Sequence, residues 1–119
     1  MEAREMFLED LARSLDYWIQ ESVSVLTQAD ADLAWTDAPE SFNRLQKAIR
    51  ENGLEVRDVE QIVSEVLRGF AVSILTTVDG GTALAERLRL AIVDDNGRSL
   101  GDELHDDFVV HLVETGRMS

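Results

Sequence analysis

Between residues 55 and 78 an apolar residue recurs at every third or fourth position without interruption, and this run decides the class of fold open to the chain. Such spacing places the apolar side chains on one stripe of an α-helix. After Gly69 the opposite side of that helix carries no charged residue either. A helix that is apolar almost all round is normally surrounded by protein. The sequence therefore predicts that Phe70 and Ile74 are buried at the centre of the core.

The same period predicts three further helices: 2–27, a second that starts near Pro39 and stops at Gly53, and 102–115. Asp37 and Glu40 have the spacing of a capping box at the start of the second helix. The stripe that this second helix is expected to bury consists of Phe42, Leu45 and Ile49. In the first helix, Glu9 and Arg13 form a favourable i,i+4 pair.

Residues 88–100 follow a different pattern, because apolar residues at 88, 90 and 92 alternate with their neighbours. Asn96-Gly97 follows them and is a strong signal for a hairpin turn. We therefore expect a short antiparallel hairpin of strands 88–93 and 98–100, which has to lean on the helices because two strands alone are marginal. The predicted fold is mainly α: a bundle of about four helices with this β-hairpin before the last helix. With 119 residues, the chain is expected to form a single domain over 1–119.

Charge and composition exclude several classes of function. The chain has 24 acidic and 11 basic residues, for a net charge of −13, and it has no cysteine. Such acidity disfavours nucleic acid and anionic membranes as partners, and the absence of cysteine excludes disulfides, thiolate metal sites and cysteine nucleophiles. The start of the chain has no signal-peptide pattern and no apolar run is long enough to cross a bilayer, so we expect a cytoplasmic protein. Ten arginines to one lysine are typical of a bacterial, GC-rich genome.

An acidic surface is the main candidate for a functional site. Residues 94–119 contain seven acidic and two basic residues, a net charge of −5, and a basic protein partner would be steered toward them. An exposed tryptophan in the acidic loop before the second helix would add an aromatic anchor. We therefore expect a small acidic binding module without catalysis, cofactor or metal, of the inhibitor or immunity type. The expected partner-binding residues are Trp35, Asp94, Asp95, Asp102, Asp106 and Asp107.

Two alternatives stay open. A metal-binding or hydrolytic enzyme would use Glu103, Asp107 and His111, which recur along one face of the last helix. A helical homodimer with a structural role would require an apolar stripe that the chain's own helices leave uncovered. His105 falls within the buried arc of the last helix and is expected to be a core histidine that donates to a carbonyl. Ser99 lies in a Gly-x-Ser-x-Gly string, but no parallel sheet is predicted to hold it as a nucleophile, so we expect it to cap the last helix.

Overall fold

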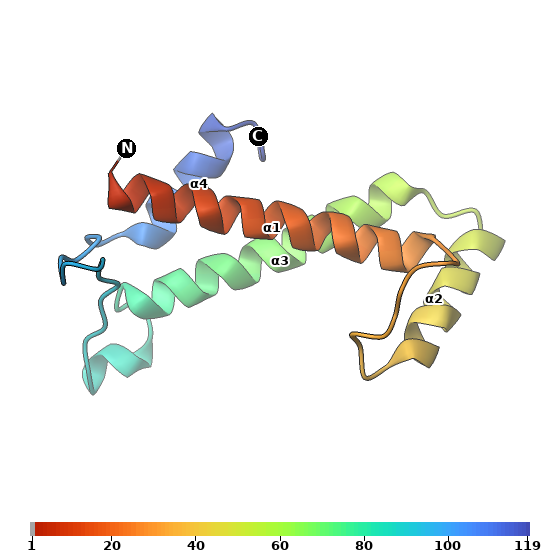
Figure 1. Ribbon diagram of the computed structural model, residues 1–119, viewed down its shortest axis with the longest axis horizontal. Coiled ribbons are helices and arrows are strands. Elements are labelled where there is room, and N and C mark those ends of the chain that lie inside the picture. Colours follow the sequence, from red (N-terminus) through yellow and green to blue (C-terminus); the bar gives the residue numbers. More distant parts are fainter. Residues whose placement is uncertain (1) are drawn as a thin grey trace. The chain divides into compact units, whose positions relative to one another are not determined.

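The computed structural model describes residues 2–119, and this part of the chain is mainly helical (Figure 1). The helices are α1 (Ala3–Thr27), α2 (Pro39–Glu51), α3 (Val56–Val78), the short 3-10 helix η1 (Ala83–Glu86) and α4 (Leu104–Glu114). The four predicted helices are thus confirmed to within two or three residues at their ends. Gly53 after α2 and Gly116 after α4 have φ angles of 64° and 75°, the left-handed conformation with which many helices stop.

The chain divides into two compact units. Unit 1 consists of the chain up to Leu15 together with Arg68–Ser119, and unit 2 consists of Asp16–Leu67. Helices α1 and α3 each contribute residues to both units. The single domain over 1–119 stays a prediction.

The core of unit 1 is built mainly by α1 and α4. Phe108 and Leu104 of α4 are completely buried. The apolar spacing of both helices predicted this packing, because residues three or four apart share one helix face. The buried apolar side chains of unit 1 are Leu8, Ala12, Leu15, Leu75, Leu104, Phe108 and Leu112.

Helix α3 is not the centre of the core, and the prediction for Phe70 and Ile74 is wrong. Phe70 is 66% exposed and Ile74 is 49% exposed. Leu75 is the only residue of α3 that is buried among those the structure describes. Unit 1 therefore packs against one narrow arc of α3 and leaves the neighbouring apolar arc uncovered, although the sequence is apolar on both.

Unit 2 buries a polar side chain where the pattern predicted leucine. Gln46 of α2 is buried, and its Nε2 donates to the carbonyl oxygens of Val25 at 2.5 Å and Gln28 at 3.2 Å. The Val25 carbonyl lies in the last turn of α1, where helical partners are lacking, and the amide of Gln46 satisfies it, whereas the Gln28 carbonyl also accepts from the N–H of Ala31 at 3.2 Å. Leu45, expected in the buried stripe, is 54% exposed instead. The predicted capping box is also wrong, because Ala38 is the N-cap residue and no side chain caps α2.

Aromatic rings connect three segments of unit 2. Trp35, in the loop between α1 and α2, makes edge-on contacts with Trp18 at 5.9 Å and with Phe42 at 5.6 Å between ring centroids. Its indole N–H donates to the carbonyl oxygen of Asp32 at 3.1 Å. Such edge-on pairs contribute about 0.5–1.5 kcal/mol beyond the area that they bury. Trp35 therefore fixes the loop while half of its own surface stays exposed.

The predicted β-hairpin is wrong, since residues 2–119 contain no strand. A single antiparallel bridge pairs Val93 with Ser99. Segment 98–100 reaches only the end of the predicted first strand, and beyond Leu100 the chain turns away because Arg4 of α1 donates to the Leu100 carbonyl oxygen at 2.7 Å. Residues 88–91 consequently have no facing segment, and alternation alone does not make a strand without one.

Candidate functional site

A groove of unit 1 lies between the first turns of α1 and α4. Its volume is about 750 Å³. Charged side chains of both signs line it, so it has no uniform potential that would select an anion or a cation. The lining residues are Arg4, Glu5, Leu8, Glu9, Arg13, Asp107, Val110, His111, Glu114 and Thr115.

Glu9 is the most heavily engaged group in this groove. Its carboxylate accepts a hydrogen bond from Arg117 Nη1 at 2.9 Å and from Arg13 Nε at 2.8 Å, and His111 Nε2 lies 3.0 Å from it. Arg117, followed by His111 and Arg13, lowers the pKa of Glu9 to about 2. A carboxylate with that pKa stays ionised at neutral pH and is a poor general acid or base. The cluster therefore ties α1 to the end of α4 by charge.

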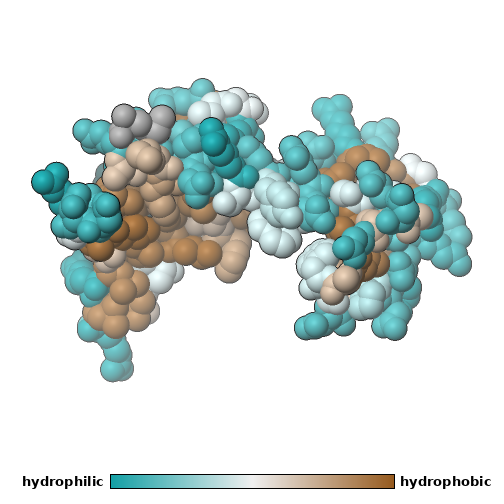
Figure 2. Space-filling model, viewed as in Figure 1, coloured by the Kyte–Doolittle hydropathy of each residue, from teal (hydrophilic) through white to brown (hydrophobic). Residues whose placement is uncertain are grey.

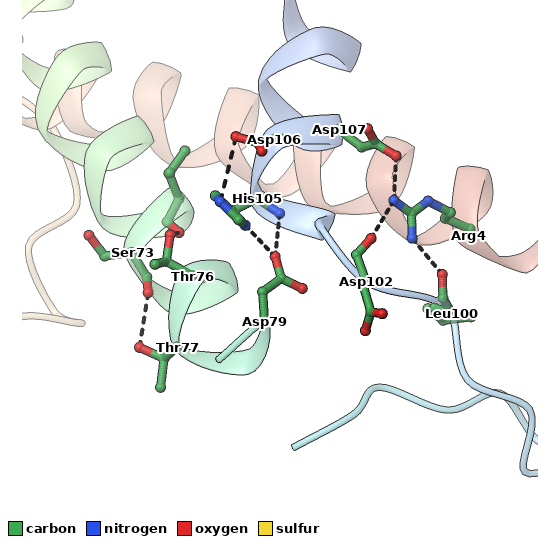
Figure 3. A network of polar contacts seen from close by, with 11 residues as sticks. Arg4, Ser73, Thr76, Thr77, Asp79, Leu100, Asp102, His105, Asp106 and Asp107 are labelled. Carbon is green, nitrogen blue, oxygen red and sulfur yellow. Dashed lines mark hydrogen bonds and ion pairs between the residues drawn. The ribbon is translucent and has the colours of Figure 1, made fainter. Parts of the chain in front are cut away.

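Arg4, in the first turn of α1, binds the segment before α4 and α4 itself (Figure 3). Its guanidinium donates to the carbonyl oxygens of Leu100 at 2.7 Å and Asp102 at 2.9 Å, and it also forms an ion pair with Asp107. Asp107 is therefore engaged with α1 and not with His111, one turn further along α4. Arg4 holds the segment that leads into α4, which explains why that segment leaves the bridge at Ser99.

His105 and Asp79 join the start of α4 to the end of α3 (Figure 3). One oxygen of Asp79 accepts from the backbone N–H of His105 at 2.8 Å and lies 2.5 Å from its ring Nδ1. Burial alone would raise the pKa of Asp79, but the hydrogen bonds from His105 and Leu104 outweigh it, and the pKa lies below its ordinary value. The bond to Asp79 raises the pKa of His105 against the opposing effect of burial. The prediction that His105 donates to a carbonyl is wrong, because its partner is a carboxylate.

The three residues of the enzyme alternative do not share a partner. Asp107 binds Arg4, His111 binds Glu9, and Glu103 stands before α4 with a left-handed φ of 59°. In the part of the chain that the structure describes, no group of three or more His, Asp or Glu side chains is placed to hold a metal ion. Ser99 accepts a hydrogen bond from the N–H of Gly101 at 3.0 Å, three residues before α4 begins. The prediction that Ser99 caps the last helix is therefore wrong.

The expected partner-binding residues fall in both units. Trp35 belongs to unit 2, whereas the five aspartates belong to unit 1. Asp94 is used within its own turn, where it accepts from the N–H groups of Asn96 and Arg98 at 2.9 Å each. Asp107 is paired with Arg4, and Asp95, Asp102 and Asp106 are the other exposed aspartates of the set, of which Asp106 lies 3.5 Å from Nε2 of His105.

A second surface was not anticipated by the sequence, and we call it the apolar surface. It consists of large apolar side chains of unit 1, each between 38% and 66% exposed. Figure 2 shows such side chains gathered over the region of unit 1 that contains the end of α3 and η1. The periodicity of α3 indicated an apolar face but contained no signal of what covers it. The members of the apolar surface are Phe70, Ile74, Leu84, Leu88, Leu90 and Val93.

One helical stretch, residues 56–86, is long and apolar enough by length and composition to cross a membrane. Charged residues occupy its first half up to Arg68, and Asp79 followed by two glycines ends α3. The uncharged run between them, 69–78, is about half of the ~20 residues that a span requires. This stretch alone is therefore weak evidence for a membrane span.

Comparison with family models, curated proteins and solved structures finds no match to this chain.

Proposed function

We propose that the protein is a cytoplasmic binding module without catalysis that works as a homodimer, and that two copies meet through the apolar surface of unit 1. The observation that carries this proposal is the exposure of Phe70, two thirds of which is open to solvent. Burying a side chain of this size stabilises a protein or a complex by about 1.5–3 kcal/mol. A second copy that covers Phe70 and its neighbours gains that contribution several times over.

The number of exposed apolar side chains in the apolar surface supports a second copy of the chain as its partner. Figure 2 shows apolar side chains gathered over the end of α3 and η1. Exposed apolar patches of several hundred Å² on a monomer often mark protein–protein interfaces. Isolated exposed leucines need no explanation, whereas six large apolar side chains are exposed in this part of unit 1.

The polar contacts of unit 1 support a role without chemistry. Glu9, Asp79 and Asp107 each bind a cationic or histidine side chain from another helix. These contacts hold α1, α3 and α4 together and engage each of these three carboxylates with a structural partner. The residues that looked most reactive in the sequence therefore support the scaffold that presents the apolar surface.

The oligomeric state of the full chain tests the proposal. Analytical ultracentrifugation from about 1 to 100 µM, a range that detects micromolar association, is expected to show a dimer for the wild type and a monomer for Phe70→Glu. Leu45→Glu is the matched control, because Leu45 is a similarly exposed apolar residue of a helix in unit 2. A monomeric wild type throughout this range, or a Phe70→Glu variant that remains dimeric with an unchanged circular dichroism spectrum, would contradict the proposal.

A second candidate function is favoured by the exposure of three carboxylates on unit 1. Asp95, Asp102 and Asp106 would attract a basic protein, as expected for an inhibitor or immunity-type module. The triple substitution of these residues by asparagine leaves Asp94 and Asp107 in their structural contacts. It is expected to slow association with such a basic partner mainly through kon, and the wild-type rate should fall with added salt. A salt-independent rate that the triple variant does not change would reduce these aspartates to a solubilising role.

A further inference from the structure

The segment before the Asp94 turn has one open backbone edge. Ile92 accepts from the N–H of Leu100 at 2.8 Å, and Asp94 donates to the carbonyl oxygen of Arg98 at 2.9 Å. These two bonds flank the Val93–Ser99 bridge and use the backbone groups of even-numbered residues. In extended chain, the backbone groups of successive residues point to opposite edges. The groups of Val93 therefore point away from segment 98–100, and a chain that continues extended toward residue 89 directs those of Ala91 and Arg89 the same way.

No backbone partner meets that edge within residues 2–119. The N–H and carbonyl groups of residues 89, 91 and 93 take part in none of the backbone or side-chain hydrogen bonds found there. The side chains of 86–91 are all exposed, so no other element of the chain covers the segment. A row of open N–H and carbonyl groups beside exposed leucines is a template for another extended segment.

We infer that segment 87–95 pairs antiparallel with the same segment of a second copy, around a two-fold axis that passes between the two Ala91 residues. The inference builds on the proposed homodimer and specifies how its two copies are aligned. In this register Ala91 faces Ala91 and Arg89 faces Val93, so that all three open residues exchange hydrogen bonds with their counterparts. Leu90 faces Ile92 across the pair, which adds an apolar contact on the opposite face of the ribbon.

In this arrangement the basic end of the segment in one copy meets the acidic end of the segment in the other copy. Arg87 and Arg89 stand at its beginning, and Asp94 and Asp95 stand at its end. Arg87 ends η1 and Asp95 lies in the turn from Asp94 to Gly97, so both stand just outside the extended part of the segment. Antiparallel pairing around Ala91 brings these ends together, with Arg87 of each copy beside Asp95 of the other. A shift of the axis to Leu90 would instead bring Glu86 opposite Asp94, and a parallel arrangement would bring like charges together. Charge therefore selects one register of the pairing.

Charge exchange at residues 87 and 95 tests the inference on the full chain. In a dimer, Arg87→Asp alone places an aspartate beside Asp95 of the other copy at both ends of the pairing, and Asp95→Arg alone places an arginine beside Arg87 at both ends. We expect each single variant to raise the dimer dissociation constant about tenfold or more. The double variant Arg87→Asp/Asp95→Arg and an equimolar mixture of the two single variants both restore opposite charges and should restore the wild-type value. Asp30→Arg, an exposed residue of unit 2, is the control for the change in net charge.

The outcomes separate this inference from the proposed function. Recovery of the dimer in the mixture supports the pairing, because only a contact between residues 87 and 95 of different copies predicts it. If the single variants dimerise as tightly as the wild type while Phe70→Glu is monomeric, the strand pairing is wrong and the apolar dimer stands. If the wild type itself is monomeric at about 100 µM, where micromolar association is detectable, both are overturned. All substituted residues are exposed, and unchanged circular dichroism spectra would verify that each variant folds.

Discussion

Arg117 Nη1 donates to Glu9 Oε1 at 2.9 Å, which joins two residues 108 positions apart in the sequence. The contact fastens the chain after α4 to the second turn of α1. Because His111 and Arg13 bind the same carboxylate, a single acidic side chain is surrounded by three basic ones. Glu9 therefore determines how unit 1 responds to acid.

Acid should destabilise the protein partly through Glu9. Its pKa is about 2 in the folded chain against an ordinary value of 4.5, so its contribution to stability is present above pH 4.5 and is lost as the pH falls toward 2. We expect Glu9→Gln to lower the thermal midpoint at pH 7 and to weaken the decline between pH 4.5 and 2. Glu5→Gln, in the same helix, is the control and should leave the profile unchanged. Parallel pH profiles of wild type and Glu9→Gln would contradict this role.

His105 should make stability depend on pH in the opposite direction. Its pKa is raised above the ordinary 6.5, so its contribution is complete below pH 6.5 and is lost as the pH rises through the folded-state pKa. An NMR titration of the His105 ring should give a midpoint above 6.5 in the wild type and a lower one in Asp79→Asn, which removes the principal cause of the shift. An identical midpoint in both proteins would show that the bond to Asp79 is not formed in solution.

Two phenylalanines should respond differently to truncation. Phe108 is completely buried, and Phe108→Ala is expected to lower the free energy of unfolding by about 3–5 kcal/mol. Phe70→Ala removes a side chain that is mostly exposed in the single chain, and at concentrations below the dimer dissociation constant its cost should be under about 1 kcal/mol. Urea denaturation at low and high protein concentration measures both. A loss of several kcal/mol for Phe70→Ala in dilute solution would show that Phe70 is buried within the single chain.

Gln46 should be essential to unit 2 despite its polarity. Gln46→Leu keeps the approximate volume but leaves the carbonyl oxygen of Val25 without its buried donor, while the Gln28 carbonyl keeps the N–H of Ala31. An unsatisfied buried polar group costs about 1–3 kcal/mol, and the expected loss of stability is of that size. Gln61→Leu, an exposed position of α3 in the same unit, is the control. Equal stabilities of the two variants would show that water replaces the donor.

The parts of the fold that the sequence predicted are local. Helix periods and the glycine stops at 53 and 116 are set by neighbouring residues, and they were confirmed. The hairpin and the burial of Phe70 depended on what lies opposite them in space, and both predictions failed. An apolar arc has the same pattern whether its cover is another helix of the chain or a second molecule.

The candidate site was predictable only in fragments. The Glu9–Arg13 pair follows from i,i+4 spacing and is confirmed at 2.8 Å. His111 reaches the same carboxylate from 102 residues away, and Asp79 reaches His105 from 26 residues away. No local pattern marks such partners. Asp107 and His111 of the predicted face lie one turn apart on α4, as the spacing indicated, but they bind different residues of α1, and Glu103 lies before the helix with a left-handed φ.

The division of the chain between the two units also sets an order for synthesis. Unit 2 is one continuous segment, 16–67, and all of its parts are available soon after Leu67 leaves the ribosome. The core of unit 1 needs residues that are synthesised last, because the apolar face of residues 8–15 is buried with Phe108 and Leu112. Glu9 likewise pairs only after Arg117 has been synthesised. During translation the first turns of α1 therefore emerge with their apolar face uncovered. The apolar face of residues 8–15 therefore stays open to a chaperone until α4 has been synthesised.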